Sequence, residues 1–374
     1  MKKVLIIGGG FAGLAALKAL SRQKGLSLSL VDRKETFDFL PLLPDLIGRG
    51  IKPQALTCRL GDLLKSKGAD FINDEVVSLD LEKRSAFLSR GSLDFDYLIA
   101  ASGSQTNFYG NKNIETSACK LDAVTDAVSL LKRLKENDFS NFIVAGGGYT
   151  GIEVASALRV FLRRSRRSAR IIIVERSPAI LGPLPPWMKE YVNANLKGLK
   201  IEVSLNSSLE RIEGGKTFLS QNRSFEESMV IWTAGVETSG YLQGLKVEKN
   251  PQGRVRVDEF MSFSEGCFAA GDAAWFLRGK GALRMAVQFS IAEGYTAGLN
   301  VIRSSQGKKL KLLRPLDLGM IIPMANNLSC GNVLGVDLRG RLPTLLHFIM
   351  CIYRACGITN KREIIINLLQ GGRK

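Results

Sequence analysis

Two stretches of the sequence repeat one arrangement of glycines. Residues 4–14 read VLIIGGGFAGL, and residues 143–154 read IVAGGGYTGIEV. Each is a short apolar run typical of a buried strand, followed by G-x-G-x-x-G and by a segment typical of a helix. Glycines at this spacing permit a tight turn, a close approach of pyrophosphate to the backbone, and close packing of the helix on the strand. The chemistry that these residues can do is the binding of two dinucleotides.

An acid should follow each glycine turn at the end of the next strand, about 20 residues later, where it binds a ribose. The stretch LSLSLVDR supplies Asp32, and ARIIIVER supplies Glu175. Glu175 favours NADH because it would repel the additional phosphate of NADPH, although Arg176 follows it directly. The residues predicted to bind the first dinucleotide are Gly8, Gly10, Phe11, Ala12, Gly13, Asp32 and Arg33. Those predicted to bind the second are Gly146, Gly148, Tyr149, Thr150, Gly151 and Glu175.

Strand, glycine turn, helix, strand and acid therefore occur twice in order, which predicts an α/β fold with two Rossmann-like units. We interpret one unit as the site of a bound flavin and the other as the site of a nicotinamide dinucleotide that binds and leaves. A chain that holds both would relay electrons from one to the other.

With these motifs, the sequence resembles the two-dinucleotide-binding flavoproteins of the pyridine nucleotide-disulfide oxidoreductase superfamily, and within them the type II NADH:quinone oxidoreductases. The stretches that carry the resemblance are FLPLLPDLIGRG (39–50), FDYLIAASGS (95–104), VIWTAGVE (230–237) and CFAAGDAAWF (267–276). The resemblance implies FAD, bound tightly but not covalently, with NADH as a substrate and a membrane quinone as the electron acceptor. The further FAD contacts that it implies are Leu40, Pro41, Ala101, Ser102, Gly103, Gly271, Asp272 and Gln288. The further NADH contacts are Glu153, Ala234 and Gly235.

The same resemblance makes Glu153 and Gln288 the candidate catalytic residues. Glu153 falls on the family's glutamate near the nicotinamide ring, and a helix-surface carboxylate without a special role is the alternative. The family commonly has Ala-Gln-x-Ala-x-Gln beside its quinone pocket. Here Gln288 is kept, whereas Val287 and Ala292 replace the first alanine and the second glutamine. The identity of the acceptor is therefore left open.

Three parts are predicted along the chain. Residues 1–111 and 258–305 form a split FAD domain, residues 112–257 form an inserted NADH domain, and residues 306–374 form a C-terminal module. In that module, Thr344, His347, Cys351 and Arg354 recur as a polar stripe on an otherwise apolar helix, which Gly357 is expected to end. A core helix, a homodimer interface and a membrane anchor are the alternatives, and the resemblance favours the anchor.

Composition narrows the class further. The net charge of +17 points to an anionic partner surface, but no nucleic-acid-reading motif accompanies it. The apolar run 4–7 is too short for a signal peptide, and no run approaches the roughly 18 apolar residues of a membrane span. The six cysteines form no Cys-x-x-Cys pair, which indicates a reducing, cytoplasmic compartment. We expect a peripheral protein on the inner face of the cell membrane.

Other functions remain open at this stage. With a single histidine and no ligand cluster near it, no metal site is expected. A soluble NAD(P)H-dependent flavoprotein reductase with a protein acceptor would share every glycine motif, and so would a protein that senses NADH without turnover. A sulfide:quinone reductase would require paired cysteines near the flavin, and Cys119 and Cys330 are the candidates.

Overall fold

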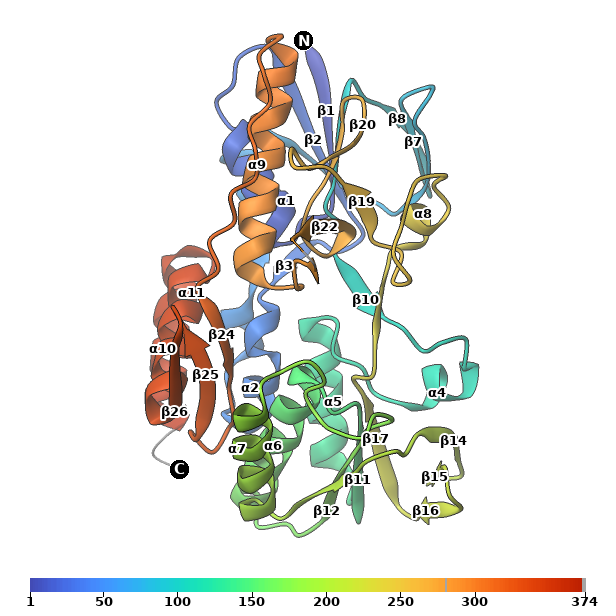
Figure 1. The fold of residues 1–374 in the computed structure, drawn as a ribbon, viewed down its shortest axis with the longest axis vertical. Coiled ribbons are helices and arrows are strands. Elements are labelled where there is room, and N and C mark those ends of the chain that lie inside the picture. The colour runs from blue at the N-terminus through green and yellow to red at the C-terminus, as the bar shows by residue number, and fades with distance from the viewer. Residues whose placement is uncertain (280, 372–374) are drawn as a thin grey trace. The chain divides into compact units, whose positions relative to one another are not determined.

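The computed structural model describes residues 1–279 and 281–371 (Figure 1). The chain forms two compact units. Unit 1 contains Met1–Phe37, Cys58–Gln105 and Val236–Asp317, and unit 2 contains Asp38–Thr57, Thr106–Gly235 and the chain from Leu318 onward. These divisions fall at other residues than the predicted 1–111, 112–257, 258–305 and 306–374. In particular, the C-terminal residues belong to unit 2 rather than to a third unit, because they pack on its core.

Unit 1 is built on a six-stranded sheet in the order β20-β21-β9-β1-β2-β5. The strands are β1 (Lys2–Ile7), β2 (Leu26–Asp32), β5 (Asp70–Asn73), β9 (Tyr97–Ala100), β20 (Ser262–Ser264) and β21 (Cys267–Ala269). All neighbours run parallel except β20 and β21, and Val4 of β1 lies opposite Leu28 and Tyr97. The apolar run that predicted the first strand is buried in the middle of this sheet, as parallel strands require.

Two helices of unit 1, α1 (Phe11–Leu20) and α9 (Val287–Ser305), lie side by side (Figure 1). A Cβ at Gly294 would lie 2.0 Å from the carbonyl oxygen of Ala12, so only glycine permits this approach. The remaining elements of unit 1 are α3 (Leu60–Lys65), α8 (Gly240–Gln243), η3 (Gly271–Ala273), the meander β6 (Val76–Asp80), β7 (Ser85–Leu88) and β8 (Gly91–Asp94), and the sheet β19 (Val255–Val257), β22 (Ala274–Arg278) and β23 (Gly281–Ala282).

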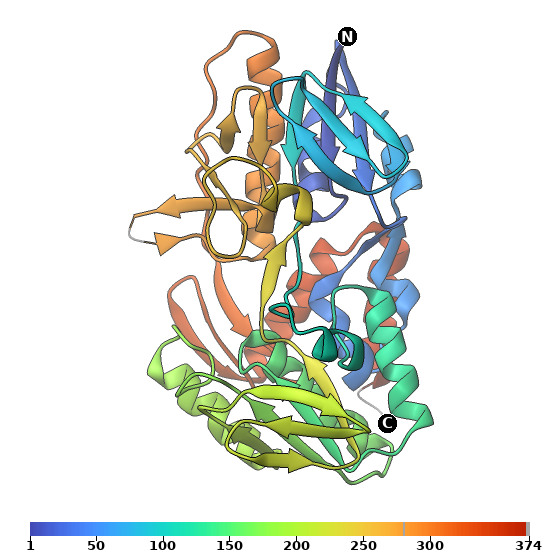
Figure 2. The same cartoon turned by 90° about the vertical axis from the view of Figure 1, so that its right-hand side faces the viewer.

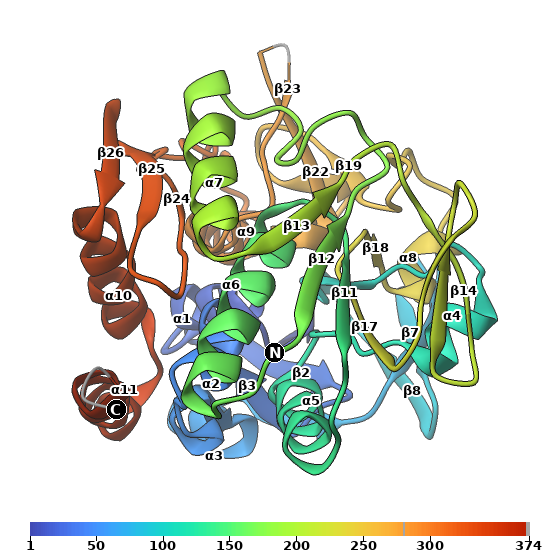
Figure 3. The ribbon, with the colours of Figure 1, turned by 90° about the horizontal axis from the view of Figure 1, so that it is seen from below.

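Unit 2 repeats the plan with a four-stranded parallel sheet in the order β13-β12-β11-β17 (Figure 3). Its strands are β11 (Asn141–Ala145), β12 (Arg170–Val174), β13 (Ile201–Ser204) and β17 (Ser228–Trp232). Its helices are α2 (Leu43–Gly48), α4 (Lys112–Ser117), α5 (Val124–Glu136), α6 (Tyr149–Arg164) and α7 (Pro186–Gly198), with the turns η1 (Leu40–Leu42) and η2 (Pro53–Leu56). The strands β14 (Leu209–Glu213), β15 (Lys216–Leu219) and β16 (Arg223–Phe225) form a separate antiparallel sheet (Figure 2).

The chain passes between the units through short strands: β3 (Thr36–Asp38), β4 (Thr57–Arg59), β10 (Ser104–Thr106) and β18 (Val236–Thr238). The C-terminal part then adds β24 (Gly319–Ile322), β25 (Ser329–Val333), β26 (Val336–Gly340), α10 (Arg341–Arg354) and α11 (Gly357–Gly371) to unit 2 (Figure 3). The predicted helix is confirmed, but Gly357 begins α11 instead of ending α10, which stops three residues earlier. In residues 1–279 and 281–371, no helix combines the length and the apolar character that crossing a membrane requires.

We expect Gly294→Ala to lower the free energy of unfolding by about 1–3 kcal/mol, because the added methyl group overpacks the contact between α9 and α1. Urea denaturation measures the change. Gly198→Ala at the end of α7 is the matched control, since its Cβ would meet no atom within 4 Å. Equal stability of the two variants would contradict the close packing of the helices.

Candidate functional site

The glycine turn of unit 1 has the geometry that the sequence predicts. Gly8 has a φ of +106°, and a Cβ there would lie 2.3 Å from the carbonyl oxygen of Ala101. A Cβ at Gly13 would lie 1.8 Å from the carbonyl oxygen of Gly8, so the helix packs directly on the turn. Gly10, in contrast, faces open space within 4 Å. The first turn of α1 therefore begins beside an open position that a phosphate can occupy.

Asp32 is fixed beside this turn. Its Oδ2 accepts a hydrogen bond from the Gly9 N–H at 2.6 Å, and its Oδ1 accepts one from the Lys34 N–H at 2.8 Å. Arg33 points to Gln105, with its Nη1 3.5 Å from Oε1. Phe11, at the start of α1, stacks edge-on against Phe37 with the ring centroids 5.1 Å apart. A carboxylate held in this way at the end of β2 is suited to bind the hydroxyl groups of a ribose.

Unit 2 reproduces these contacts almost atom for atom. Gly146 has a φ of +112°, and a Cβ at Gly151 would lie 1.9 Å from the carbonyl oxygen of Gly146. Gly148 faces open space within 4 Å. Glu175 accepts hydrogen bonds from the Gly147 N–H at 2.7 Å and from the Ser177 N–H at 2.8 Å. Tyr149 begins α6 beside Thr150 and donates from its hydroxyl to Met320 Sδ at 2.9 Å.

In each sheet, the strand order reverses beside the first strand: β2 and β9 flank β1, and β12 and β17 flank β11. Ligands of open α/β sheets bind at such a switch point, outside the carboxyl ends of the strands. In unit 1 the segment that follows β9 is Ala101, Ser102 and Gly103, and in unit 2 Ala234 and Gly235 follow β17. The structure therefore brings each predicted pair of loops together within its own unit.

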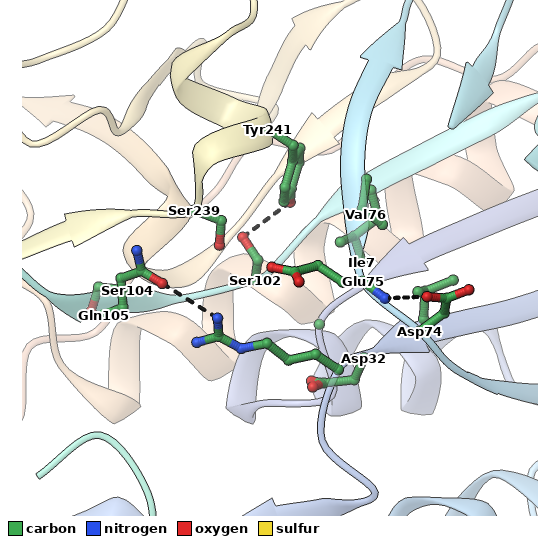
Figure 4. Close-up of a pocket in the computed structure, with 13 residues that line it drawn as sticks. Ile7, Asp32, Asp74, Glu75, Val76, Ser102, Ser104, Gln105, Ser239 and Tyr241 are labelled. Atoms are coloured by element: carbon green, nitrogen blue, oxygen red, sulfur yellow. Dashed lines mark hydrogen bonds between the residues drawn. The ribbon is translucent and has the colours of Figure 1, made fainter. Parts of the chain in front are cut away.

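A cavity with an empty volume of about 470 Å³ opens at the switch point of unit 1 (Figure 4). Four of the residues predicted to contact FAD line it: Gly8, Asp32, Arg33 and Ser102. The lining residues that the sequence analysis missed are Ile7, Val31, Asp74, Glu75, Val76, Ser104, Gln105, Ser239 and Tyr241. The Tyr241 hydroxyl donates to Ser102 Oγ at 3.0 Å, and burial raises the pKa of this tyrosine. Asp74 and Glu75 follow β5, the neighbour of β2, so their position at the carboxyl end of a strand was the available signal.

The second predicted FAD motif lies in the same unit. Gly271 has a φ of +69°, and its N–H donates to Glu293 Oε2 at 2.7 Å. Asp272 Oδ2 accepts from the Ser104 hydroxyl at 2.8 Å, and burial raises the pKa of Asp272. Burial also raises the pKa of Glu293 to about 8. Arg254 is buried nearby, and its Nε has no hydrogen-bond partner in the described part of the chain.

These features of unit 1 fit FAD. The open glycine turn and the N–H groups of α1 suit a pyrophosphate, Asp32 suits a ribose, and Asp272 and the unpartnered Arg254 Nε offer polar atoms to the rest of the cofactor. Gln288 lies in the first turn of α9, and its Nε2 is 3.3 Å from Asp317 Oδ1. Leu40 and Pro41, also predicted to contact FAD, are part of unit 2, and their contact with FAD stays a prediction.

Unit 2 contains a smaller cavity, of about 280 Å³ empty volume, lined by carboxylates on two helices. Glu153 of α6 and Asp45 of α2 line it together with Pro41, Arg49 and Phe348. Burial raises the pKa of Glu153 to about 8, and the negative charge of Asp45 contributes. Burial raises the pKa of Asp45 to about 6 although Arg49 Nε lies 2.7 Å from its Oδ1. Glu153 is therefore a group that holds a proton at neutral pH.

The single histidine lies near the same residues. His347 Nε2 is 3.6 Å from Cys351 Sγ, one turn apart on α10. Burial and the adjacent Arg49 lower the pKa of His347 to about 4, so its ring is neutral. Burial raises the pKa of the Cys351 thiol. In the described residues, none of the six cysteines forms a disulfide, and no group of three His, Cys, Asp or Glu side chains is placed to hold a metal ion.

Comparisons with known proteins agree with this geometry. The profile of the pyridine nucleotide-disulphide oxidoreductase family matches residues 2–295. The demethylphylloquinone reductase NdbB of Synechocystis is 26% identical over 94% of this chain and 92% of its own length. The type II NADH:quinone oxidoreductase of Staphylococcus aureus is 22% identical over 91% of this chain and 92% of its own length.

Among solved structures, NDH2 of Plasmodium falciparum in complex with NADH superposes with a TM-score of 0.87, covering 99% of this chain and 98% of that one at 16% identity. At this identity the likeness shows the fold. The predicted α/β fold with Rossmann-like units is confirmed, and so is the resemblance to type II NADH:quinone oxidoreductases.

The raised pKa of Glu153 predicts a pH-dependent stability. Between about pH 4.5 and 8 the folded chain retains a proton that the unfolded chain releases, so stability falls as the pH rises through this window. We expect Glu153→Gln to be more stable relative to the native protein at pH 8 than at pH 5, by on the order of 1–2 kcal/mol. Urea denaturation at both pH values measures this difference. Glu190→Gln, on the exposed side of α7, is the control, and the same pH response in both variants would contradict the assignment.

Proposed function

Because the chain belongs to the pyridine nucleotide-disulphide oxidoreductase family, we propose that it is an FAD-dependent NADH:quinone oxidoreductase that does not pump protons. The observation that carries the proposal is the duplicated dinucleotide cradle. Two sheets each present a glycine turn, the start of a helix directly behind it and a fixed acid. The relatives in Synechocystis and S. aureus, both named as quinone reductases, support the choice of acceptor.

FAD, when bound in unit 1, supplies the chemistry: it accepts a hydride from NADH and returns two electrons to the acceptor. The residues of unit 1 bind and orient it. The Gly8–Gly13 turn holds the pyrophosphate, Asp32 holds a ribose, and Asp272 holds the chain that leads to the ring. Non-covalent binding is part of the proposal, because the groups assigned to FAD offer hydrogen bonds and charge–dipole interactions.

NADH binds unit 2 in this proposal. The Gly146–Gly151 turn and the start of α6 take the pyrophosphate, and Glu175 takes the adenosine ribose. A 2′-phosphate at this position would meet the Glu175 carboxylate, which is already fixed by the Gly147 and Ser177 N–H groups and cannot easily turn away. NADH is therefore preferred over NADPH.

The two carboxylates of the unit 2 cavity, Glu153 and Asp45, serve the acceptor. Reduction of a quinone to a quinol consumes two protons as well as two electrons. Glu153, with its pKa raised to about 8, holds a proton at neutral pH, and Asp45 lies on the same cavity. We assign Glu153 as the proton-holding residue, and Gln288 as a contact to FAD in unit 1.

The C-terminal helices support attachment to a membrane surface. On α10 the polar stripe is turned inward: Thr344 is buried and bonds Ser329, and Cys351 is buried beside His347. The exposed apolar residues of α10 and α11 are Leu342, Leu345, Ile349, Tyr353, Ile358, Ile365, Ile366 and Leu369. With a net charge of +17, a peripheral position on the anionic inner face of the cell membrane accounts for this surface.

The function is tested by mixing the FAD-loaded protein rapidly with NADH and then with a short-chain quinone, while flavin absorbance is followed. NADH should reduce the protein faster than NADPH, and the quinone should reoxidise it. Reduction by NADH with reoxidation only by a protein such as a ferredoxin would instead indicate a soluble reductase. Reduction by sulfide and not by NADH would indicate a sulfide:quinone reductase.

Membrane attachment is tested with the double variant Leu345→Ser, Ile349→Ser. We expect at least a tenfold weaker partition into vesicles that contain anionic phospholipid, because two exposed apolar side chains are lost. Co-sedimentation measures it. Val77→Ser, an exposed valine of unit 1, is the control. Unchanged partition, together with a loss of homodimer in light scattering, would assign the apolar surface to a dimer interface.

A further inference from the structure

A short turn next to the four-stranded sheet of unit 2 carries a tyrosine in an unusual backbone conformation. Tyr109 has a φ of +52°, in the left-handed region, and Gly110 follows with a φ of +75°. A bulky residue in this region is rare and is strained unless the surrounding structure fixes it. The side chain is nevertheless 65% exposed, so burial of the ring does not explain why the conformation is kept.

Hydrogen bonds hold the turn from both sides. The Asn107 N–H donates to the Gly235 carbonyl at 3.0 Å, and Trp232 Nε1–H donates to the Asn107 carbonyl at 2.9 Å. Within the turn, the Tyr109 N–H donates to Asn107 Oδ1 at 2.6 Å. The Asn111 N–H donates to the Phe108 carbonyl at 3.0 Å. The backbone around Tyr109 is therefore fixed, and so is the position from which the side chain extends.

This fixed ring lies at the end of β17. The Tyr109 hydroxyl donates to the Ala234 carbonyl at 3.2 Å, and a Cβ at Gly235 would lie 2.1 Å from that hydroxyl. Ala234 is also the neighbour of the glycine turn, since a Cβ at Gly146 would lie 2.9 Å from the Ala234 Cα. Tyr109 thus borders the switch point of unit 2, where a dinucleotide binds.

The sheet order indicates which half of the dinucleotide faces the tyrosine. Glu175, at the end of β12, marks the adenosine side of the crevice, and the start of α6 marks the pyrophosphate. The strand on the opposite side of β11 is β17. A dinucleotide that extends from β12 across the glycine turn must place its nicotinamide riboside on the β17 side, where Tyr109 stands.

We propose that Tyr109 is a substrate-binding residue whose ring packs against the nicotinamide riboside of bound NADH. This inference rests on the proposed function, because it takes NADH as the ligand of unit 2. A tyrosine on a fixed turn suits the role: it offers a large rigid surface to a planar ring and loses little conformational freedom on binding. The strained backbone is then retained because it presents the ring, not because it stabilises the fold.

Two substitutions at this position separate the ring from the hydroxyl and from the backbone. Tyr109→Gly removes the ring and suits a positive φ, so the turn keeps its conformation. Tyr109→Phe keeps the ring and removes only the bond to Ala234. Tyr295→Ala, at an exposed tyrosine of unit 1, is the control for the loss of a surface aromatic side chain, since alanine suits α9 better than glycine does.

Calorimetric titration with NAD⁺ and steady-state kinetics with NADH test the inference on the FAD-loaded protein. We expect Tyr109→Gly to weaken NAD⁺ binding and to raise KM for NADH about five- to tenfold, with kcat and FAD content unchanged. Tyr295→Ala should stay within twofold of the native protein, and Tyr109→Phe, which keeps the ring, should lose less affinity than Tyr109→Gly.

Two results would overturn the inference. If NADH reduces the native protein but Tyr109→Gly binds NAD⁺ equally well, Tyr109 does not contact the ligand. If Tyr109→Gly loses FAD or melts at a lower temperature in step with its loss of NAD⁺ binding, the ring is structural. A native protein that NADH does not reduce would refute the proposed function itself, which keeps the two failures apart.

Discussion

The absence of a side chain at Gly13 and Gly151 is the constraint on which both units depend. At each position a Cβ would lie less than 2 Å from a carbonyl oxygen of the preceding turn, at 1.8 Å and 1.9 Å respectively. The helix that follows can therefore begin directly against the strand. In that position the first N–H groups of the helix point at the crevice. The N–H of Gly9 or Gly147 can then reach the acid at the end of the next strand. The positions of the turn, the helix and the acid therefore depend on one another.

This arrangement of turn, helix and acid is local, and for that reason it could be predicted from the sequence. The strands, the two glycine turns, Asp32 and Glu175 lie where the spacing indicates, since each contact joins residues that are close in the chain or on adjacent strands. Tyr241 and Glu293 could not be found in this way. They reach the site from segments more than 100 residues away from the first glycine turn, and no spacing rule connects them to it.

The division into units escaped prediction for a related reason. Residues 38–57 follow the first ribose acid closely, so the sequence places them with the FAD domain, yet Ile47 packs in the core of unit 2. Gly48 of α2 permits this, since a Cβ there would lie 3.0 Å from Ala157 of α6. The C-terminal strands use the same core, into which Ile322, Met324 and Cys330 pack. Apolar patterning shows that a segment has a face to bury, but not which of two cores will bury it.

The polar stripe of α10 faces inward because of the residues that the helix covers. Its inner side faces Asp45, Arg49 and Glu153. A wholly apolar face there would leave these polar groups without partners. Arg49 also stacks over the Phe348 ring, with its Cζ 4.8 Å from the ring centroid. A polar inner stripe therefore has a physical reason. With Thr344 and Cys351 turned inward, several apolar residues of the helix, among them Leu345 and Ile349, lie on its outer side. The exposed apolar surface of the C-terminal helices thus depends on the carboxylates of the cavity. Apolar side chains in the cavity would remove the reason for the polar inner stripe and, with it, the reason for the apolar outer surface.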